Sequence, residues 1–164
     1  MAAEPIETRR LRLVPKTLAE ARAQIDAMNA QQRAQLSSDW LARLDSATAD
    51  LWTLGFAIVD RDTNAVVGTC GFKGPPGADG IVEIAYGVTP EQQGKGYATE
   101  AAEALVSYAF GTGEVRLVRA HTFDAESAST RVLARCGFKA AGEVFDPEDG
   151  LVWRWERQRD RGSH

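Results

Sequence analysis

The sequence has few of the residues that build metal centres, disulfide frameworks or membrane spans. Its 164 residues include two histidines and two cysteines, Cys70 and Cys136. The cysteines lie far apart, without the paired spacing of a metal site or the density of a small secreted domain, so we expect two buried free thiols and no metal. No apolar run approaches the roughly 18 residues that a transmembrane helix requires.

An excess of basic residues is also missing. Nineteen Lys and Arg stand against 23 Asp and Glu, which gives a formal net charge of −4 and a pI of 5.2. Proteins that bind a nucleic-acid backbone usually carry clustered positive charge, so we expect no nucleic-acid partner. The N-terminal segment is charged and has no apolar core of the kind found in signal peptides. We therefore expect a cytoplasmic protein that does not attach to a membrane.

What the chain does have is the composition of one globular domain. Apolar residues make up 44% and charged residues 26% of it, as in ordinary soluble domains. No repeat, low-complexity tract or linker divides the sequence. We predict a single domain over residues 1–157, followed by a solvated tail over residues 158–164.

Hydrophobic periodicity predicts a mixed α/β arrangement. Thr17 and Glu20 have the spacing of a capping box at a helix start, and Gly137 has the position of a glycine just past a helix end. Alternating apolar residues predict strands, and a period near 3.6 predicts helices. The predicted strands are 6–14, 53–60, 65–73, 81–89, 115–122, 138–145 and 151–156, and the predicted helices are 17–30, 38–50, 98–110 and 125–136.

The segment from Val88 to Glu100 places two glycines between a predicted strand and a predicted helix. Gly94 and Gly96 permit a tight turn with accessible backbone N–H groups. Unpaired N–H donors and the positive end of the helix dipole then converge on one point, which is the geometry of an anion site, and Lys95 adds charge. The spacing fits neither a nucleotide phosphate loop nor a dinucleotide fingerprint. The alternative is a plain glycine turn that feeds a helix.

The motif Gln93-x-x-Gly96-x-Ala98 resembles the (Gln/Arg)-x-x-Gly-x-(Gly/Ala) pyrophosphate loop of the GNAT superfamily, the acetyl-CoA-dependent N-acetyltransferases. Residues 7–13, 94–101 and 129–138 also resemble the branch of ribosomal-protein N-terminal acetyltransferases of the RimJ/RimL type. The resemblance covers nearly the whole chain. It implies a mixed α/β fold: a mostly antiparallel sheet of six to seven strands, splayed at a central parallel pair and flanked by about four helices.

The resemblance also implies that acetyl-CoA is the co-substrate. The Val88 backbone would pair with the pantetheine arm as an added strand does, and the loop N–H groups would hold the pyrophosphate. Arg131 and Arg135, one helical turn apart, would reach the 3′-phosphate; the alternative is a solvated helix face. The cofactor-binding residues implied in this way are Val88, Gln93, Gly94, Lys95, Gly96, Tyr97, Ala98, Thr99 and Arg131.

The sequence departs from the family at two positions. Glu126 stands where an Asn usually contacts the cofactor, and Leu133 stands where many relatives place a Tyr that acts as general acid. The proton for the leaving thiolate is then expected from Ser129, from another group or from water. The alternative for Ser129 is a helical serine bonded to a backbone carbonyl one turn back.

Glu83 is the best candidate for the catalytic base. An α-amino group with a pKa of ~8 needs modest help to become neutral, and a lysine amine at ~10.4 needs more. Strand alternation places Glu83 on one face with Ala85 and Gly87, which suggests space for a ligand; the alternative is a structural ion pair with an Arg. His121 is a second candidate, as a base or as a structural strand-end residue. The backbone N–H near Val88 is the implied oxyanion donor.

Cysteine and tryptophan are also candidates for functional roles, but structural roles fit them better. Cys136 falls on the apolar face of its predicted helix, which disfavours a role as nucleophile. The four tryptophans are candidates for an acceptor pocket, but core packing is the expected role for most of them. They are Trp40, Trp52, Trp153 and Trp155.

The sequence thus predicts an N-acetyltransferase that uses acetyl-CoA and direct attack in a ternary complex. The acceptor is a primary amine of a protein N-terminus, an amine metabolite or an antibiotic, and the protein is a monomer or a homodimer. The alternative is a non-catalytic coenzyme-A-binding or regulatory module.

Overall fold

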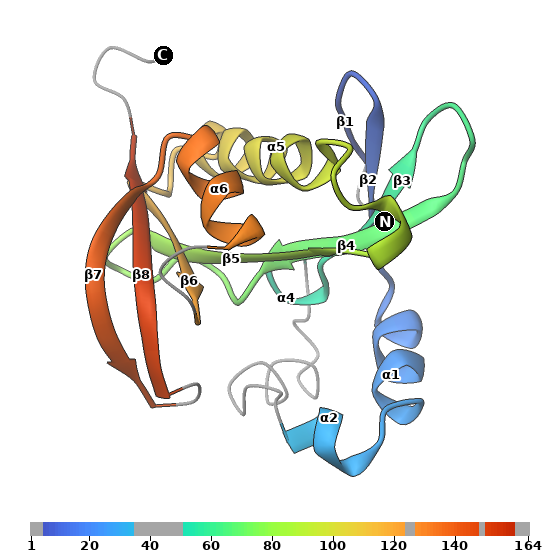
Figure 1. Ribbon diagram of the computed structural model, residues 1–164, viewed down its shortest axis with the longest axis horizontal. Helices are drawn as coiled ribbons and strands as arrows, with labels where there is room; N and C mark the ends of the chain where they lie inside the picture. Colours follow the sequence, from blue (N-terminus) through green and yellow to red (C-terminus); the bar gives the residue numbers. More distant parts are fainter. Residues whose placement is uncertain (1–4, 35–50, 124–126, 148–149, 160–164) are drawn as a thin grey trace.

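The computed structural model describes residues 5–34, 51–123, 127–147 and 150–159 (Figure 1). Eight strands form one sheet in the order β1-β2-β3-β4-β5-β6-β8-β7. They are β1 (Ile6–Glu7), β2 (Leu11–Pro15), β3 (Phe56–Asp60), β4 (Val66–Phe72), β5 (Ile81–Val88), β6 (Leu117–Thr122), β7 (Lys139–Asp146) and β8 (Gly150–Gln158).

Helices lie on both sides of this sheet. The longest, α5, and its neighbour α6 lie along one face, and α4 packs against β4 on the other (Figure 1). Of the neighbouring strand pairs, β5 and β6 are parallel and the others are antiparallel. The helices are α1 (Leu18–Asp26), α2 (Ala30–Ala34), α4 (Leu51–Leu54), α5 (Tyr97–Gly111) and α6 (Ala128–Arg135), with a 3-10 turn, η1 (Pro90–Gln92).

This architecture confirms the predicted mixed sheet with one parallel pair, but the sheet has eight strands rather than six to seven. The additional strand arises because the predicted strand 6–14 is a hairpin of β1 and β2. The chain turns where the Thr8 N–H donates to the Leu11 carbonyl at 2.9 Å and the Leu11 N–H donates to the Thr8 hydroxyl oxygen at 2.9 Å. Three residues of the predicted strand, Thr8 to Arg10, therefore form a turn between β1 and β2.

The first helix begins as predicted and ends earlier. The Thr17 and Glu20 capping box is present, which confirms the predicted start. The helix stops at Asp26 rather than at residue 30 because Asn29 and Gln32 exchange side-chain-to-backbone hydrogen bonds that start α2. The predicted helix 38–50 lies outside the described residues.

Two further boundaries differ from the predictions. The predicted strand 53–60 starts at Phe56, because Leu51–Leu54 is helical and Gly55 turns the chain with a φ of +76°. At the other end of the chain, β8 extends through Gln158, one residue into the predicted tail. Residues 160–164 of that tail lie outside the described part of the chain.

The core lies between α5 and the sheet. The buried face of α5 contains Ala101, Ala102, Leu105, Val106 and Ala109, as its periodicity predicts. Below it, Leu11, Phe56 and Ile58 are fully buried in the sheet. The alanines of this face let the helix lie close to the strands.

The tryptophans of the described chain serve mainly the core. Trp52 packs against Phe72, with ring centroids 4.6 Å apart, and against Tyr108. The Trp155 indole N–H donates to the Thr122 hydroxyl at 3.2 Å. Trp40 lies outside the described residues. No helix in the described ranges has the length and apolar character needed to cross a membrane.

Candidate active site

A gap opens in the middle of the sheet, where the two parallel strands diverge. Their described ladder comprises three residue pairs, from Ile81↔Leu117 to Glu83↔Arg119. Beyond these pairs β5 continues to Val88 and stays paired with β4, whereas β6 continues to Thr122 and stays paired with β8. The structure therefore contains the splayed parallel pair that the family resemblance implies.

The edge of β5 that faces this gap presents backbone hydrogen-bonding groups. On the opposite edge the Lys73 N–H donates to the Glu83 carbonyl at 2.9 Å, and the Thr89 N–H donates to the Val67 carbonyl at 2.9 Å. In an antiparallel ladder such residues alternate with residues whose N–H and C=O point the other way. The backbone groups of Ile84, Tyr86 and Val88 therefore point into the gap.

A pocket of about 110 Å³ lies where the strands part. Its walls come from β5, β6 and α6 and from Lys73, directly after β4, so segments far apart in sequence meet there. Glu83, His121 and Ser129, the three predicted catalytic residues, all line it. The other lining residues are Lys73, Ile84, Ala85, Tyr86, Ala120, Thr122 and Leu133.

Glu83 stands at the base of the gap between two nitrogen-bearing side chains. Lys73 Nζ lies 2.8 Å and His121 Nδ1 lies 3.1 Å from Glu83 Oε2. Burial acts to raise the Glu83 pKa, but the His121 ring and the Lys73 ammonium outweigh it, so this pKa lies below its ordinary value. The carboxylate is therefore ionised at neutral pH. Its cationic partner is Lys73 rather than an arginine.

His121 is held by a third residue, Arg154. Arg154 Nε donates a hydrogen bond of 3.1 Å to His121 Nε2, so Nε2 carries a lone pair and Nδ1 carries the proton of the neutral ring. The Nδ1–H faces Glu83 but is not aligned on its oxygen, which leaves this buried nitrogen without a well-formed hydrogen bond among the described residues. The ring thus has a defined tautomer and a donor at the pocket wall.

Ser129 and Tyr86 bring two hydroxyl groups to the same pocket. Ser129 is the second residue of α6, because Ser127 caps this helix with its own side chain. The residues one turn before it lie outside the described part of the chain, so the alternative of a bond to a backbone carbonyl one turn back stays a prediction. The Tyr86 hydroxyl donates to the Ser129 carbonyl at 3.1 Å, and burial raises the Tyr86 pKa, so the phenol stays protonated.

The glycine loop joins this gap to α5. Gly94 and Gly96 have φ angles of +80° and +84°, which favour glycine, and Gly96 occupies the N-cap position of α5 without a capping side chain. The first N–H groups of a helix have no partner within it. The Gln93 side-chain amide donates to the Val88 carbonyl at 3.0 Å, and Lys95 Nζ donates to Gln92 Oε1 at 3.0 Å.

Comparison with known proteins agrees with this geometry. Residues 3–139 match the family described as the acetyltransferase (GNAT) domain. The chain belongs to the GNAT acetyltransferase family. An N-acetyltransferase of Bacillus licheniformis, p20, is 31% identical over 93 residues, which are 57% of this chain and 52% of p20. The chain spans about half the length of the curated relatives it matches.

Solved structures share the fold of this GNAT domain at low sequence identity. RimL, a ribosomal L7/L12 α-N-protein acetyltransferase in complex with coenzyme A, superposes with a TM-score of 0.69 at 19% identity, over 94% of this chain and 98% of RimL. The ribosomal-protein-S5-alanine acetyltransferase of Vibrio fischeri superposes with a TM-score of 0.69 at 16% identity, over 99% and 100% of the two chains.

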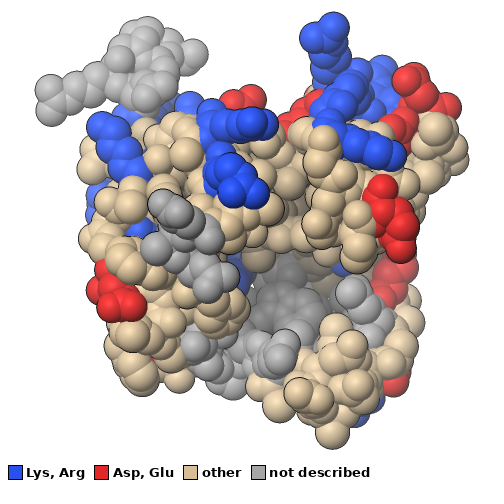
Figure 2. All heavy atoms as spheres, viewed as in Figure 1, with Lys and Arg blue, Asp and Glu red and all other residues tan. Residues whose placement is uncertain are grey.

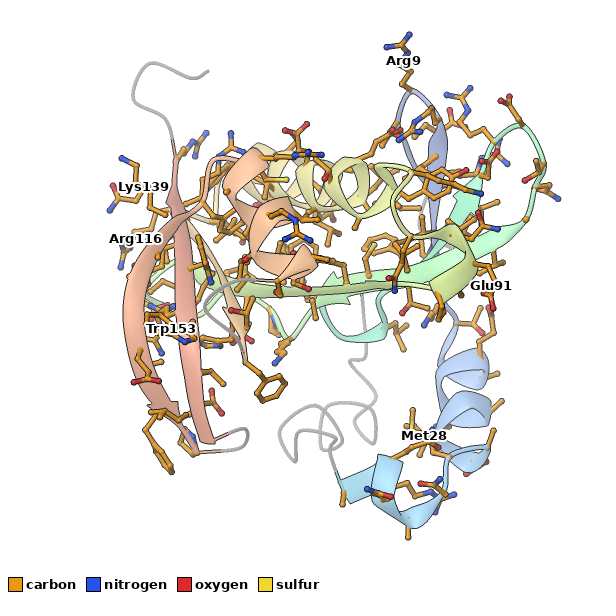
Figure 3. All side chains as sticks on the ribbon, viewed as in Figure 1. Arg9, Met28, Glu91, Arg116, Lys139 and Trp153 are labelled. Carbon is orange, nitrogen blue, oxygen red and sulfur yellow. The ribbon has the colours of Figure 1, made fainter. Side chains whose placement is uncertain are left out.

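The remaining predicted site residues of the GNAT domain lie at or beyond the start of α5. Tyr97, Ala98 and Thr99 form its half-buried first turn, whereas Arg131 and Arg135 are exposed on α6. In the face shown in Figure 2, Lys and Arg side chains gather near α6 and over the β1–β2 hairpin. Figure 3 places Arg9 at the tip of that hairpin and Glu91 on η1, both pointing outward.

Three residues of this site were not predicted from the sequence. Strand alternation places Tyr86 on the face opposite Glu83, yet both line the pocket, because the open gap exposes the edge of β5 as well as its faces. Lys73 and Arg154 complete the contacts of Glu83 and His121. The pairing of strands β4 with β5 and β6 with β8 is what brings them there, and no local sequence signal reports it.

The described residues contain no cluster of three or more His, Cys, Asp and Glu side chains that is placed to hold a metal ion. The two cysteines are buried, and burial raises the pKa of Cys136 to about 11 and that of Cys70 to about 12. Both thiols are therefore protonated near neutral pH, which disfavours a covalent route through Cys136.

Proposed function

We propose that this GNAT domain is an acetyl-CoA-dependent N-acetyltransferase that acts on a primary amine by direct attack in a ternary complex. The observation that carries the proposal is the pocket at the β5–β6 gap. The Glu83 carboxylate, the His121 imidazole and two hydroxyl groups line it. This pocket lies on the strand that leads into an uncapped helix N-terminus, where an anion is stabilised.

The residues present fit coenzyme A in both its parts. The gap-facing backbone groups of Ile84, Tyr86 and Val88 recur every second residue, roughly 6.6 Å apart, and suit an extended chain with amide groups, such as the pantetheine arm. The loop from Gln93 to Thr99 supplies N–H donors and a helix dipole for the pyrophosphate. Exposed Arg131 supplies positive charge on α6 for the 3′-phosphate.

Acetyl-CoA supplies an activated acetyl thioester to this site. Glu83 is proposed as the proton acceptor for the acceptor amine, since it is ionised and held between Lys73 and His121. A proton taken from the amine neutralises the carboxylate beside Lys73, and His121 Nδ1–H provides a donor next to it. Backbone N–H groups of the β5 edge are proposed to stabilise the charge that develops on the thioester oxygen.

The leaving sulfur requires a donor on the other side of the pocket. Ser129 and Tyr86 both reach this region from α6 and β5. The Tyr86 hydroxyl already donates to the Ser129 carbonyl, so the Ser129 hydroxyl is proposed as the hydrogen-bond donor to the sulfur. A thiol has a pKa of ~8.5, well below that of an aliphatic hydroxyl, so the proton itself is proposed to reach the sulfur through water.

The test is a free-thiol assay with purified protein, acetyl-CoA and a panel of amines. The panel contains peptides with free N-termini, amine metabolites and aminoglycosides, and peptides with blocked N-termini serve as matched controls. We expect thiol release with at least one primary amine and none with its N-acetylated form. Coenzyme A binding without thiol release across the panel would support the non-catalytic coenzyme-A-binding module instead.

A further inference from the structure

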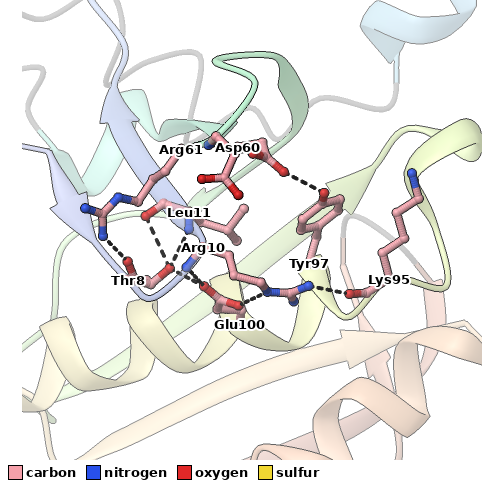
Figure 4. A network of polar contacts seen from close by, with 9 residues as sticks. Thr8, Arg10, Leu11, Asp60, Arg61, Lys95, Tyr97 and Glu100 are labelled. Atoms are coloured by element: carbon pink, nitrogen blue, oxygen red, sulfur yellow. Dashed lines mark hydrogen bonds and ion pairs between the residues drawn. The ribbon is translucent and has the colours of Figure 1, made fainter.

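The N-terminal hairpin contacts the loop that the proposed function assigns to the pyrophosphate. Arg10, in the turn between β1 and β2, lies 85 residues before Lys95 in sequence, yet Arg10 Nη1 donates to the Lys95 carbonyl at 2.9 Å (Figure 4). Its guanidinium also lies over the Tyr97 ring, 5.1 Å from the centroid. One side chain thus contacts the residue before and the residue after Gly96.

Glu100 fixes this guanidinium in place. Its Oε1 accepts from Arg10 Nε at 2.8 Å, and its Oε2 accepts from the Arg10 backbone N–H at 2.8 Å and from the Thr8 hydroxyl. The Glu100 side chain is 17% exposed and that of Arg10 is 43% exposed. The pair therefore links the hairpin to the first turn of α5, and Arg10 cancels a negative charge that would otherwise oppose an anion at this helix end.

The contact with the Lys95 carbonyl has a consequence for the next peptide group. In a planar trans peptide the C=O of one residue and the N–H of the next point in opposite directions. Because Arg10 holds the Lys95 carbonyl toward the hairpin, the Gly96 N–H points away from it, toward the open side of the loop. A Cβ on Gly96 would lie 3.0 Å from Arg10 Nη2, so glycine is also what allows the guanidinium this close.

A second contact fixes the residue that follows Gly96 at the start of α5. The Tyr97 hydroxyl donates to Asp60 Oδ2 at 2.6 Å, and Asp60 Oδ1 accepts from the N–H groups of Asp62 and Thr63. The start of α5 is thus attached to the β1–β2 hairpin through Arg10 and to the β3–β4 turn through Asp60 (Figure 4).

We propose that Arg10 is a positioning residue for the phosphate-binding loop: it orients the Lys95–Gly96 peptide so that the Gly96 N–H faces the pyrophosphate, while its charge is neutralised by Glu100. This inference rests on the proposed function. Arg10 Nη1 donates to the Lys95 carbonyl and Nε donates to Glu100, so these two nitrogens act on the loop rather than on the ligand. Arg10 should therefore affect the binding of ligands that carry a pyrophosphate and should not affect the binding of pantetheine along the β5 edge.

The experiment compares coenzyme A binding by calorimetry in wild type, Arg10→Met and Arg12→Met. Arg12 is the matched control, because it lies on the same hairpin and pairs with Glu7 at 3.2 Å without touching the loop. We expect Arg10→Met to weaken coenzyme A by about 10- to 100-fold, the range of one charge-assisted hydrogen bond, and Arg12→Met to bind as wild type does.

Pantetheine, which lacks the pyrophosphate, separates positioning from general damage. Its binding, followed by NMR shifts of the β5 amides, should be the same in Arg10→Met and wild type. The proposal would be overturned if Arg10→Met lost affinity for coenzyme A and for pantetheine by the same factor. It would also be overturned if Arg10→Lys, which keeps the charge but not the planar guanidinium donors, bound coenzyme A with wild-type affinity. If Arg10→Met does not fold, Arg10→Gln is used in its place. Failure of the wild type to bind coenzyme A would instead refute the proposed function.

Discussion

Arg154 Nε donates to His121 Nε2 at 3.1 Å, and this bond assigns the proton of the neutral imidazole to Nδ1, on the Glu83 side. We expect nitrogen-detected NMR of wild type to show that the neutral His121 ring carries its proton on Nδ1 and not on Nε2. Arg154→Met should give a mixture of the two tautomers, because no donor then holds Nε2. A single, unchanged tautomer in the variant would contradict this assignment.

Replacing Glu83 by Gln should lower turnover by about 10²- to 10⁴-fold, the usual effect of removing a general base. Because the Glu83 pKa lies below its ordinary value, the wild-type carboxylate is ionised from about pH 6 to 9, and the rise in rate over that range should follow the acceptor amine. Glu156→Gln is the control, since Glu156 pairs with Arg119 outside the pocket. Wild-type turnover in Glu83→Gln would make Glu83 structural.

The same carboxylate should make stability depend on pH in a defined direction. Its folded-state pKa lies below the unfolded value of about 4.3. The ion-pair cluster therefore stabilises the fold above that value, and the stabilisation is lost as the pH falls through the folded-state pKa. Urea unfolding at about pH 7 and about pH 3.5 should show the stability gap between wild type and Glu83→Gln narrowing at the lower pH. A constant gap would contradict the depressed pKa.

The two hydroxyl groups of the pocket can be separated by substitution. Tyr86 donates to the backbone carbonyl of residue 129, so Ser129→Ala leaves that bond intact while Tyr86→Phe removes it. If Ser129 donates to the leaving sulfur, Ser129→Ala should lower turnover by about 10²-fold or more with little change in coenzyme A affinity. Ser107→Ala, at an exposed position of α5, is the matched control. Weakened affinity with normal turnover would make Ser129 a cofactor anchor.

Alanine substitutions at two glycines with the same left-handed conformation can separate an effect on coenzyme A binding from an effect of backbone strain. Gly96 and Gly113 have φ angles of +84° and +78° at opposite ends of α5. Alanine at either position should cost about 1–2 kcal/mol of stability. Coenzyme A affinity should fall in Gly96→Ala, where the new Cβ also meets Arg10, and stay normal in Gly113→Ala. Equal affinities in two folded variants would show that the loop does not bind the pyrophosphate.

The sequence predicts most of the fold because its signals are local. The alternation of β5, the apolar face of α5 and the Schellman end of α6, with the Phe138 N–H on the Leu133 carbonyl at 3.0 Å, each depend on a few neighbouring residues. The hairpin at Thr8 was missed because its turn is stabilised partly by Glu100, on the distant α5. Likewise, Lys73 and Arg154 reach the pocket residues only because β4 and β8 pair with β5 and β6, which no local sequence pattern reports.

The divergence of β5 and β6 also makes the sheet two half-sheets, joined in the described chain by three residue pairs. One half, β1 to β5, bears the loop that leads into α5, and the other, β6 to β8, bears His121 and Arg154. An extended ligand laid along the gap would act as a ninth strand that joins the halves. A ligand that binds only the folded state adds its binding free energy to the stability of the fold, and here it would do so by bridging the two half-sheets.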